Sequence, residues 1–311
     1  MKKKLWYVLV PLFILGIFSV PLVCSAITGI QISPLTFNYE IKKGDSQTGK
    51  ILVTNRNDDP LTYKIESEQF NGTDENGAPN FTPVEPNGIT DLHDWISFPT
   101  DAEGTIAPHL DKEVPFVINV PIDATPGGHY AAIFAREIRK TPEGQTVVGV
   151  ASRVGTLVLV SVPGPVTKGA EIISFTSPKF IWKGPVDFIL KIKNNGTVHY
   201  DSQAKVELKP ALFGSTQTVD LGKHTLVPTS TRSYSGIWNK RFPFGYYNIT
   251  ASAKDGNGQD ITTKTTLWAI PLEIVLPAIV LVIIIVLIIG YIRRHVRFIS
   301  NKTPNNPPST P

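Results

Sequence analysis

The chain has 311 residues, of which 41% are hydrophobic and 18% charged, and a formal net charge of +4. This composition is typical of a globular protein and excludes a wholly disordered chain. The surplus of positive charge lies at the two ends of the chain, so the stretch between them is slightly acidic. Because that stretch also lacks a recognisable nucleic-acid-binding motif, the sequence argues against a nucleic-acid partner.

Residues 1–26 are typical of a signal peptide. Three lysines precede an apolar run over residues 5–23, and Cys24, Ser25 and Ala26 form a small-residue cleavage pattern. Cleavage there would make Ile27 the first residue of the mature chain. An uncleaved run would be a second membrane span that still leaves the following chain outside the cell. Cys24 is the only cysteine, which favours a bacterial surface protein over a disulfide-rich eukaryotic one.

Residues 27–165 are predicted to form a first immunoglobulin-like β-sandwich. Apolar and polar side chains alternate along them as in half-buried strands, so that Val114 and Phe116, for example, share one face. The expected strands lie near residues 30–32, 37–41, 49–55, 61–70, 95–98, 110–120, 131–138 and 147–162. Pro126 and the two glycines after it predict a corner, where we expect the Tyr130 hydroxyl to hold the turn as tyrosines do in many sandwiches.

Residues 166–268 are predicted to form a second immunoglobulin-like β-sandwich. Pro163, Gly164 and Pro165 end the preceding strand and stiffen the connection, so the two sandwiches should meet at a limited range of angles. The expected strands lie at residues 171–175, 186–193, 202–208, 217–221, 230–238, 245–253 and 260–268. We therefore expect an all-β chain of two tandem immunoglobulin-like β-sandwiches, followed by one transmembrane helix.

Residues 272–292 are predicted to be that helix. The stretch 274–292 has no charged side chain, and at about 1.5 Å per residue it nearly matches the ~30 Å hydrocarbon core of a bilayer. Arginines follow at once, and such positive flanks stay in the cytoplasm, which places the two sandwiches outside the cell. Residues 293–311 are expected to be a short, basic, disordered cytoplasmic tail. The alternative is the buried core helix of a soluble domain.

The sequence offers no strong pattern for catalysis, a metal or a cofactor. The common nucleotide-binding, hydrolase and zinc-protease motifs are absent, and the six histidines are scattered. His93 and Asp94 resemble half of a catalytic triad, but no nucleophile is marked by its context. We therefore predict that the protein is not an enzyme and that it holds no cofactor.

The best candidate for a binding site is the polar loop that follows the predicted strand 61–70. It is dense in turn-forming residues, and long polar loops on a rigid sandwich often carry binding. Its acidic residues also raise the question of calcium, but the EF-hand spacing is absent, which favours a solvated loop tip. The candidate ligand-binding residues are Phe70, Asn71, Asp74, Asn76 and Gly77.

Several short motifs that combine prolines, glycines and aromatic residues occur in order along the chain. They are Ile32-Ser33-Pro34, Phe70-Asn71-Gly72, Pro126-Gly127-Gly128-His129-Tyr130, Asn195-Gly196-Thr197-Val198-His199, Leu226-Val227-Pro228, Phe244-Gly245-Tyr246-Tyr247 and Trp268-Ala269-Ile270-Pro271. In this order they resemble the WxL-interacting protein family of bacterial surface proteins. In that family a signal peptide precedes two immunoglobulin-like domains, a single C-terminal span and a short basic tail.

The resemblance implies a non-catalytic, membrane-anchored tether or adhesion scaffold. Its first domain would bind cell-wall peptidoglycan, and its second domain would bind a WxL-type surface protein. Two other roles stay open on the sequence alone. A chaperone-like module would bind client proteins by strand complementation at a sheet edge. A surface hydrolase would need a cleft that holds acids with shifted pKa values.

Overall fold

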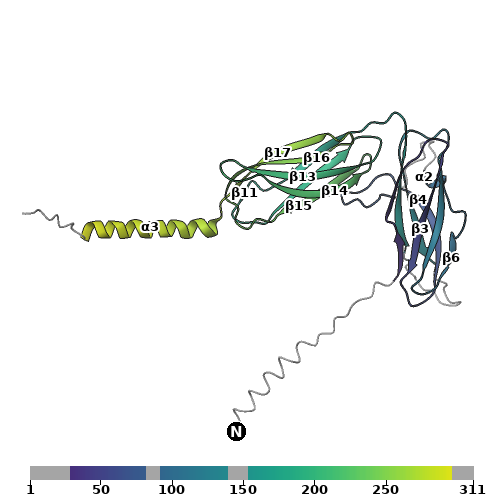
Figure 1. Ribbon diagram of the computed structural model, residues 1–311, viewed down its shortest axis with the longest axis horizontal. Coiled ribbons are helices and arrows are strands. Elements are labelled where there is room, and N and C mark those ends of the chain that lie inside the picture. The colour runs from purple at the N-terminus through teal and green to yellow at the C-terminus, as the bar shows by residue number, and fades with distance from the viewer. Residues whose placement is uncertain (1–28, 82–91, 139–152, 296–311) are drawn as a thin grey trace, which may run out of the picture.

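The computed structural model describes residues 29–81, 92–138 and 153–295. The predicted signal peptide, most of the predicted cytoplasmic tail and the first part of the predicted strand 147–162 lie outside these residues. Within them the chain is β-structure apart from a four-residue helix and one long helix at the C-terminal end (Figure 1). An all-β chain followed by a helix, as predicted, is therefore confirmed.

The first half of the chain forms two sheets. Their strands are β1 (Ile30–Ser33), β2 (Thr36–Glu40), β3 (Ser46–Asn55), β4 (Leu61–Gln69), β5 (Ile96–Ser97), β6 (Glu103–Ile106), β7 (Asp111–Asn119), β8 (Gly127–Glu137) and β9 (Arg153–Val162). One sheet has the order β1-β3-β7-β5 and the other the order β2-β9-β8-β4-β6. Neighbouring strands are antiparallel except β2 and β9, which run parallel. We call this pair of sheets the first sandwich.

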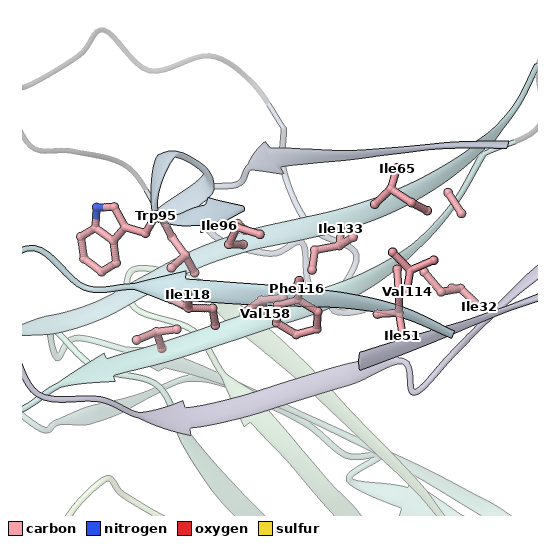
Figure 2. Close-up of a cluster of buried hydrophobic side chains, with 14 of the residues drawn as sticks. Ile32, Ile51, Ile65, Trp95, Ile96, Val114, Phe116, Ile118, Ile133 and Val158 are labelled. Carbon is pink, nitrogen blue, oxygen red and sulfur yellow. The ribbon is translucent and has the colours of Figure 1, made fainter. Parts of the chain in front are cut away.

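A continuous apolar core fills the space between these two sheets (Figure 2). Ile51 and Phe116 enter it from one sheet and Ile133 and Val158 from the other, and all four side chains are fully buried. The Phe116 ring lies over Gly49 of the neighbouring strand, where any Cβ would overlap it. The alternation of apolar side chains thus provides two inner faces, and a glycine makes room for the largest ring.

Three local features of the first sandwich differ from the expected strands. Trp95 ends a short helix, α2 (Leu92–Trp95), rather than starting a strand, because one helical turn brings it and Leu92 onto the same buried face. Gly127 and Gly128 lie within β8 and pair with Val162 and Ser161, so the chain turns before them. β6 was not predicted, since four residues are too few to show a periodicity.

The second half forms another pair of sheets, the second sandwich. Its strands are β10 (Ala170–Thr176), β11 (Phe180–Ile181), β12 (Val186–Asn194), β13 (Tyr200–Pro210), β14 (Gln217–Leu226), β15 (Thr231–Trp238), β16 (Gly245–Lys254) and β17 (Asp260–Ala269). The sheet orders are β10-β12-β15 and β11-β17-β16-β13-β14. Phe188 and Leu190 pack from one sheet against Val206 and Ile249 of the other in a separate core. All seven predicted strands are present, and only the two-residue β11 was missed.

A single helix, α3 (Leu272–His295), follows the last strand almost directly. By length and composition its segment Leu272–Arg294 can cross a membrane, and none of it is buried against the rest of the chain. The core helix of a soluble domain would be covered by its own protein, so that interpretation does not fit. Figure 1 shows α3 leaving the end of the second sandwich that is remote from the first.

Candidate functional site

The two sandwiches meet at an apolar cluster of their own, which we call the joint. Phe70, Tyr130 and Leu159 of the first sandwich pack there against Val227 of the second, and all four side chains are buried. The ring centroids of Phe70 and Tyr130 lie 5.6 Å apart. Burial of large apolar side chains from both halves holds the sandwiches together by contact and not by the proline-rich connection alone.

A chain of polar groups crosses the same joint, in which Tyr130 and His199 are buried and Asn38 is exposed. The Tyr130 hydroxyl lies 3.2 Å from His199 Nδ1, and His199 Nε2 lies 2.8 Å from Asn38 Oδ1. Because an amide oxygen only accepts, Nε2 carries the hydrogen and donates it, while Nδ1 accepts from the tyrosine hydroxyl. The expectation that Tyr130 ties its own corner was therefore wrong: the hydroxyl lies over Gly128, yet its hydrogen bond crosses to the second sandwich.

The arrangement requires a neutral imidazole at His199. Burial lowers the pKa of this group from 6.5 to about 4, and the nearby Asp201 carboxylate opposes the shift only in part. Burial likewise raises the pKa of the Tyr130 hydroxyl, so this group stays protonated and can donate. These shifts reflect burial at the joint and require no catalytic function.

The predicted binding loop is the third part of the joint. Thr73 and Pro79 close it into a small hairpin. From this hairpin the Thr73 amide donates to Ser230 Oγ at 2.8 Å, and the Glu75 carbonyl accepts from the Ser233 amide at 2.8 Å. The carboxylate of Glu75 also pairs with Lys191 at 2.7 Å. The loop therefore lies on β12 and β15 of the second sandwich instead of projecting freely as a tip.

The five candidate residues have different positions in this loop. Phe70 is buried in the joint, and the Asn71 amide donates to the Asn80 carbonyl across the hairpin. Asp74 Oδ1 accepts from the backbone amides of Asn76 and Ala78, which fixes the turn, and Asn76 is itself exposed. Gly77 has a φ of +87° and lies against the Arg232 guanidinium. Whether the loop also binds a ligand stays a prediction.

Glu75, His199, Ser230 and Ser233 are the joint residues that the sequence did not single out for this role. Each is an ordinary polar residue in or beside a turn or strand. Their partners lie many residues away along the chain, so no local pattern could have paired them. Only the predicted corner after Pro126 gave any signal, and that signal pointed at Tyr130.

Beside the joint lies a polar cavity of about 450 Å³. It is lined by the end of β2, the connection after β9 and the start of β13, including Asn38, Lys168, His199 and Asp201. Within the described part of the chain no three His, Cys, Asp or Glu side chains gather as a metal site would require. His93 and Asp94 contact one another at 3.3 Å, but the nearby Ser67 hydroxyl donates to the His93 carbonyl and not to its ring.

The free edges of the sheets differ strongly between the two sandwiches. In the first sandwich the four strands at the sheet ends have only two to five residues. In the second, β10, β14 and β15 have seven, ten and eight residues, and each ends its sheet. A long end strand presents a row of backbone groups to which another chain can add a strand. Among these end strands, β14 is the longest.

The outward backbone groups of β14 can be identified from the ladder. The Ala211 amide donates to the Tyr246 carbonyl. This bond shows that, at the end of β13, the backbone N–H of Ala211 points toward β16. Because these directions alternate along a strand, Glu207 faces β16 while Val206 and Leu208 face β14. By the β13–β14 register, Thr218 and Asp220 then direct their own N–H and C=O groups away from β13, but the Asp220 carbonyl lies close to Gly236 of β15. A bulge at Gly222 interrupts the row further along.

No protein-family model matches the chain, and no curated protein matches it either. Among solved structures it is similar to the class 5 fimbriae chaperone CfaA, at 14% identity and a TM-score of 0.36, over 77% of this chain and 99% of the other. The Pseudomonas aeruginosa CupB2 chaperone is similar at 12% identity and a TM-score of 0.35, over 75% of this chain and 98% of the chaperone. A chain of the Salmonella enterica SafA pilin–SafB chaperone complex is similar at 7% identity and a TM-score of 0.37, over 78% of this chain and 97% of that chain. Scores at this level carry no argument about function.

Proposed function

We propose that this chain is a non-catalytic, membrane-anchored surface protein whose second immunoglobulin-like sandwich binds an extracellular protein by strand addition. The observation that carries the proposal is the edge of β14, the longest of the three long end strands of the second sandwich. α3 anchors the chain in the cell membrane, and the second sandwich directly precedes it, on the extracellular side. The joint then holds the first sandwich at a set angle farther from the membrane.

Strand addition uses features that β14 already has. Thr218 offers an outward backbone donor and acceptor and Asp220 an outward donor, and the side chains of both residues are exposed and polar. Backbone hydrogen bonds supply affinity in such complexes, while the side chains of alternate residues select the partner. The bulge at Gly222 limits the row to a short segment, which guards against indiscriminate pairing with other chains.

The resemblance to WxL-interacting proteins supports a tether as the biological setting. In a tether the second sandwich holds a WxL-type surface protein, for which the β14 edge is a physical means, and the first sandwich binds peptidoglycan. A chaperone-like module would use the same edge on a client. The two roles differ in one measurable respect, since a client folds only when its chaperone is present, whereas a tethered protein folds alone.

The proposal predicts the effect of one proline. In full-length protein in detergent micelles, Thr218→Pro removes an outward N–H without breaking the β13–β14 ladder. Thr218→Ala is the matched control, because it removes the side chain and keeps the amide. Loss of one hydrogen bond of about 0.5–1.5 kcal/mol weakens binding of a recombinant WxL-type protein roughly threefold to tenfold. Equal binding by both variants, or no binding by the unaltered chain, would count against the proposal.

A further inference from the structure

The end of the second sandwich from which α3 begins carries a group of exposed apolar side chains, which we call the tip. Phe213 is 91% exposed, Leu212 82%, Phe244 71% and Trp182 57%. They come from the segments after β11, β13 and β15. The Ala211 amide bonded to the Tyr246 carbonyl, and the Ile270 amide bonded to the Ile181 carbonyl, bring these segments together at one end. Single exposed apolar residues are ordinary, but a contiguous group marks an interaction surface.

Basic side chains accompany the apolar group. Lys183, Lys240 and Arg241 belong to the same segments, Lys179 directly precedes β11, and the acidic Glu273 lies at the start of α3. That carboxylate lies 3.6 Å from Lys183 Nζ. The Arg241 guanidinium lies 5.0 Å from the centroid of the Phe242 ring. Aromatic side chains bordered by Lys and Arg are the composition that proteins place at the headgroup level of a bilayer.

The position of α3 decides what covers the tip. An apolar groove of about 570 Å³ runs between Phe242 and Phe244 on one side and the first turns of α3 on the other, from Ile274 to Ile283. Side chains that lie beside the first turns of a membrane-spanning helix share the depth of those turns. If α3 crosses the bilayer, both phenylalanines must therefore lie at the boundary between headgroups and acyl chains. Filling a groove lined in this way with water would be unfavourable in free energy.

We infer that the tip rests in the outer leaflet of the membrane and binds anionic phospholipid. The aromatic and aliphatic side chains enter the interface, an acyl chain occupies the groove beside α3, and the basic groups contact headgroup phosphates. This contact gives the second sandwich a second attachment besides α3 and so limits its rotation about the helix. The inference rests on the membrane span of the proposed function and is independent of the β14 edge.

Spin labels on the full-length chain test the inference. With Cys24→Ser as background, Phe213→Cys, Leu110→Cys and Leu281→Cys each carry one nitroxide in phosphatidylcholine–phosphatidylglycerol vesicles. Power saturation then compares collisions with oxygen and with a water-soluble nickel chelate. We expect the label at 213 within roughly 5–10 Å of the headgroup–chain boundary. The label at 110, at an exposed site of the first sandwich, should report water, and the label at 281 should report hydrocarbon.

The two possible failures give different results. If the label at 213 reports water while the label at 281 reports hydrocarbon, the span stands and the tip inference is overturned. If the label at 281 also reports water, the membrane span fails and the inference fails with it.

A double variant, Lys240→Gln with Arg241→Gln, tests the charged part. The ratio of inserted to free tip should fall about fivefold per charge removed in anionic vesicles. No change on moving to vesicles of phosphatidylcholine alone would overturn the choice of anionic lipid.

Discussion

The two sandwiches have similar layouts and cores but opposite kinds of edge. In the first, the end strands are very short, and Pro115 in β7 has no N–H with which to bind a further strand. In the second, three end strands are long, although β10 and β14 each contain a register shift and the Ser233 amide of β15 is bonded to Glu75. Cores of comparable packing therefore tell little about function here. The edges differ in the length of backbone that they present, and only those of the second sandwich are long enough for the proposed strand addition.

The largest expected effect tests whether the two sandwiches are separate folding units. Phe116 and Phe188 are fully buried in different cores. Replacing either by Ala should lower the free energy of unfolding by about 3–5 kcal/mol through lost burial and a residual cavity. Hydrogen exchange read by mass spectrometry should then show reduced protection mainly in the sandwich that carries the substitution. Equal loss in both sandwiches for both variants would mean that they fold as one unit.

The joint should respond to pH through His199. Its folded pKa, about 4, is lower than the unfolded value of 6.5, so the unfolded chain binds more protons between these values. Stability is therefore full above pH 6.5 and falls as the pH drops toward 4, by at most roughly 3 kcal/mol. Urea unfolding at pH 7 and pH 4.5 should show this loss, and His199→Gln should reduce it. An identical pH dependence in the variant would show that other groups cause it.

A substitution at Gly77 should have a smaller effect and should widen the range of angles between the two sandwiches. Gly77→Val places a side chain against the Arg232 guanidinium and strains a backbone with φ of +87°, a combined cost of about 1–3 kcal/mol. Gly258→Val is the matched control, because its φ is +80° and nothing lies near the added Cβ. Distances between spin labels at Leu110 and Ile237 should broaden only for the Gly77 variant. Equal broadening in both would exclude the loop as the fixing contact.

The smallest effect on stability concerns the predicted binding loop. The Asn76 side chain is exposed, so Asn76→Ala should change the free energy of unfolding by less than about 0.5 kcal/mol. If the loop binds the wall, this variant should co-sediment less with peptidoglycan sacculi than the unaltered full-length chain. Unchanged co-sedimentation would remove the loop from the binding site. Absence of co-sedimentation by the unaltered chain would contradict a wall-binding first sandwich.

Much of the fold follows from local patterns in the sequence. Alternation such as Val114, Phe116 and Ile118 predicts a strand with one buried face, because the side-chain period of a strand is two. The uncharged stretch before Arg293 predicts a span, because its length alone fits a bilayer. The short elements were missed where the chain gives too few residues for a period, as in β6, or where one helical turn buries Leu92 and Trp95 together.

The joint and the free edges were decided by tertiary structure. Glu75 meets Ser233, and Tyr130 meets His199, only because two separately folded sandwiches come together, and nothing in the neighbourhood of either residue marks its distant partner. The same holds for β14, whose sequence resembles that of any half-buried strand. Its edge is free because of the order in which the strands pair. Local periodicity determines which residues form strands, whereas strand order and domain contact determine which backbone groups and side chains remain available for a partner.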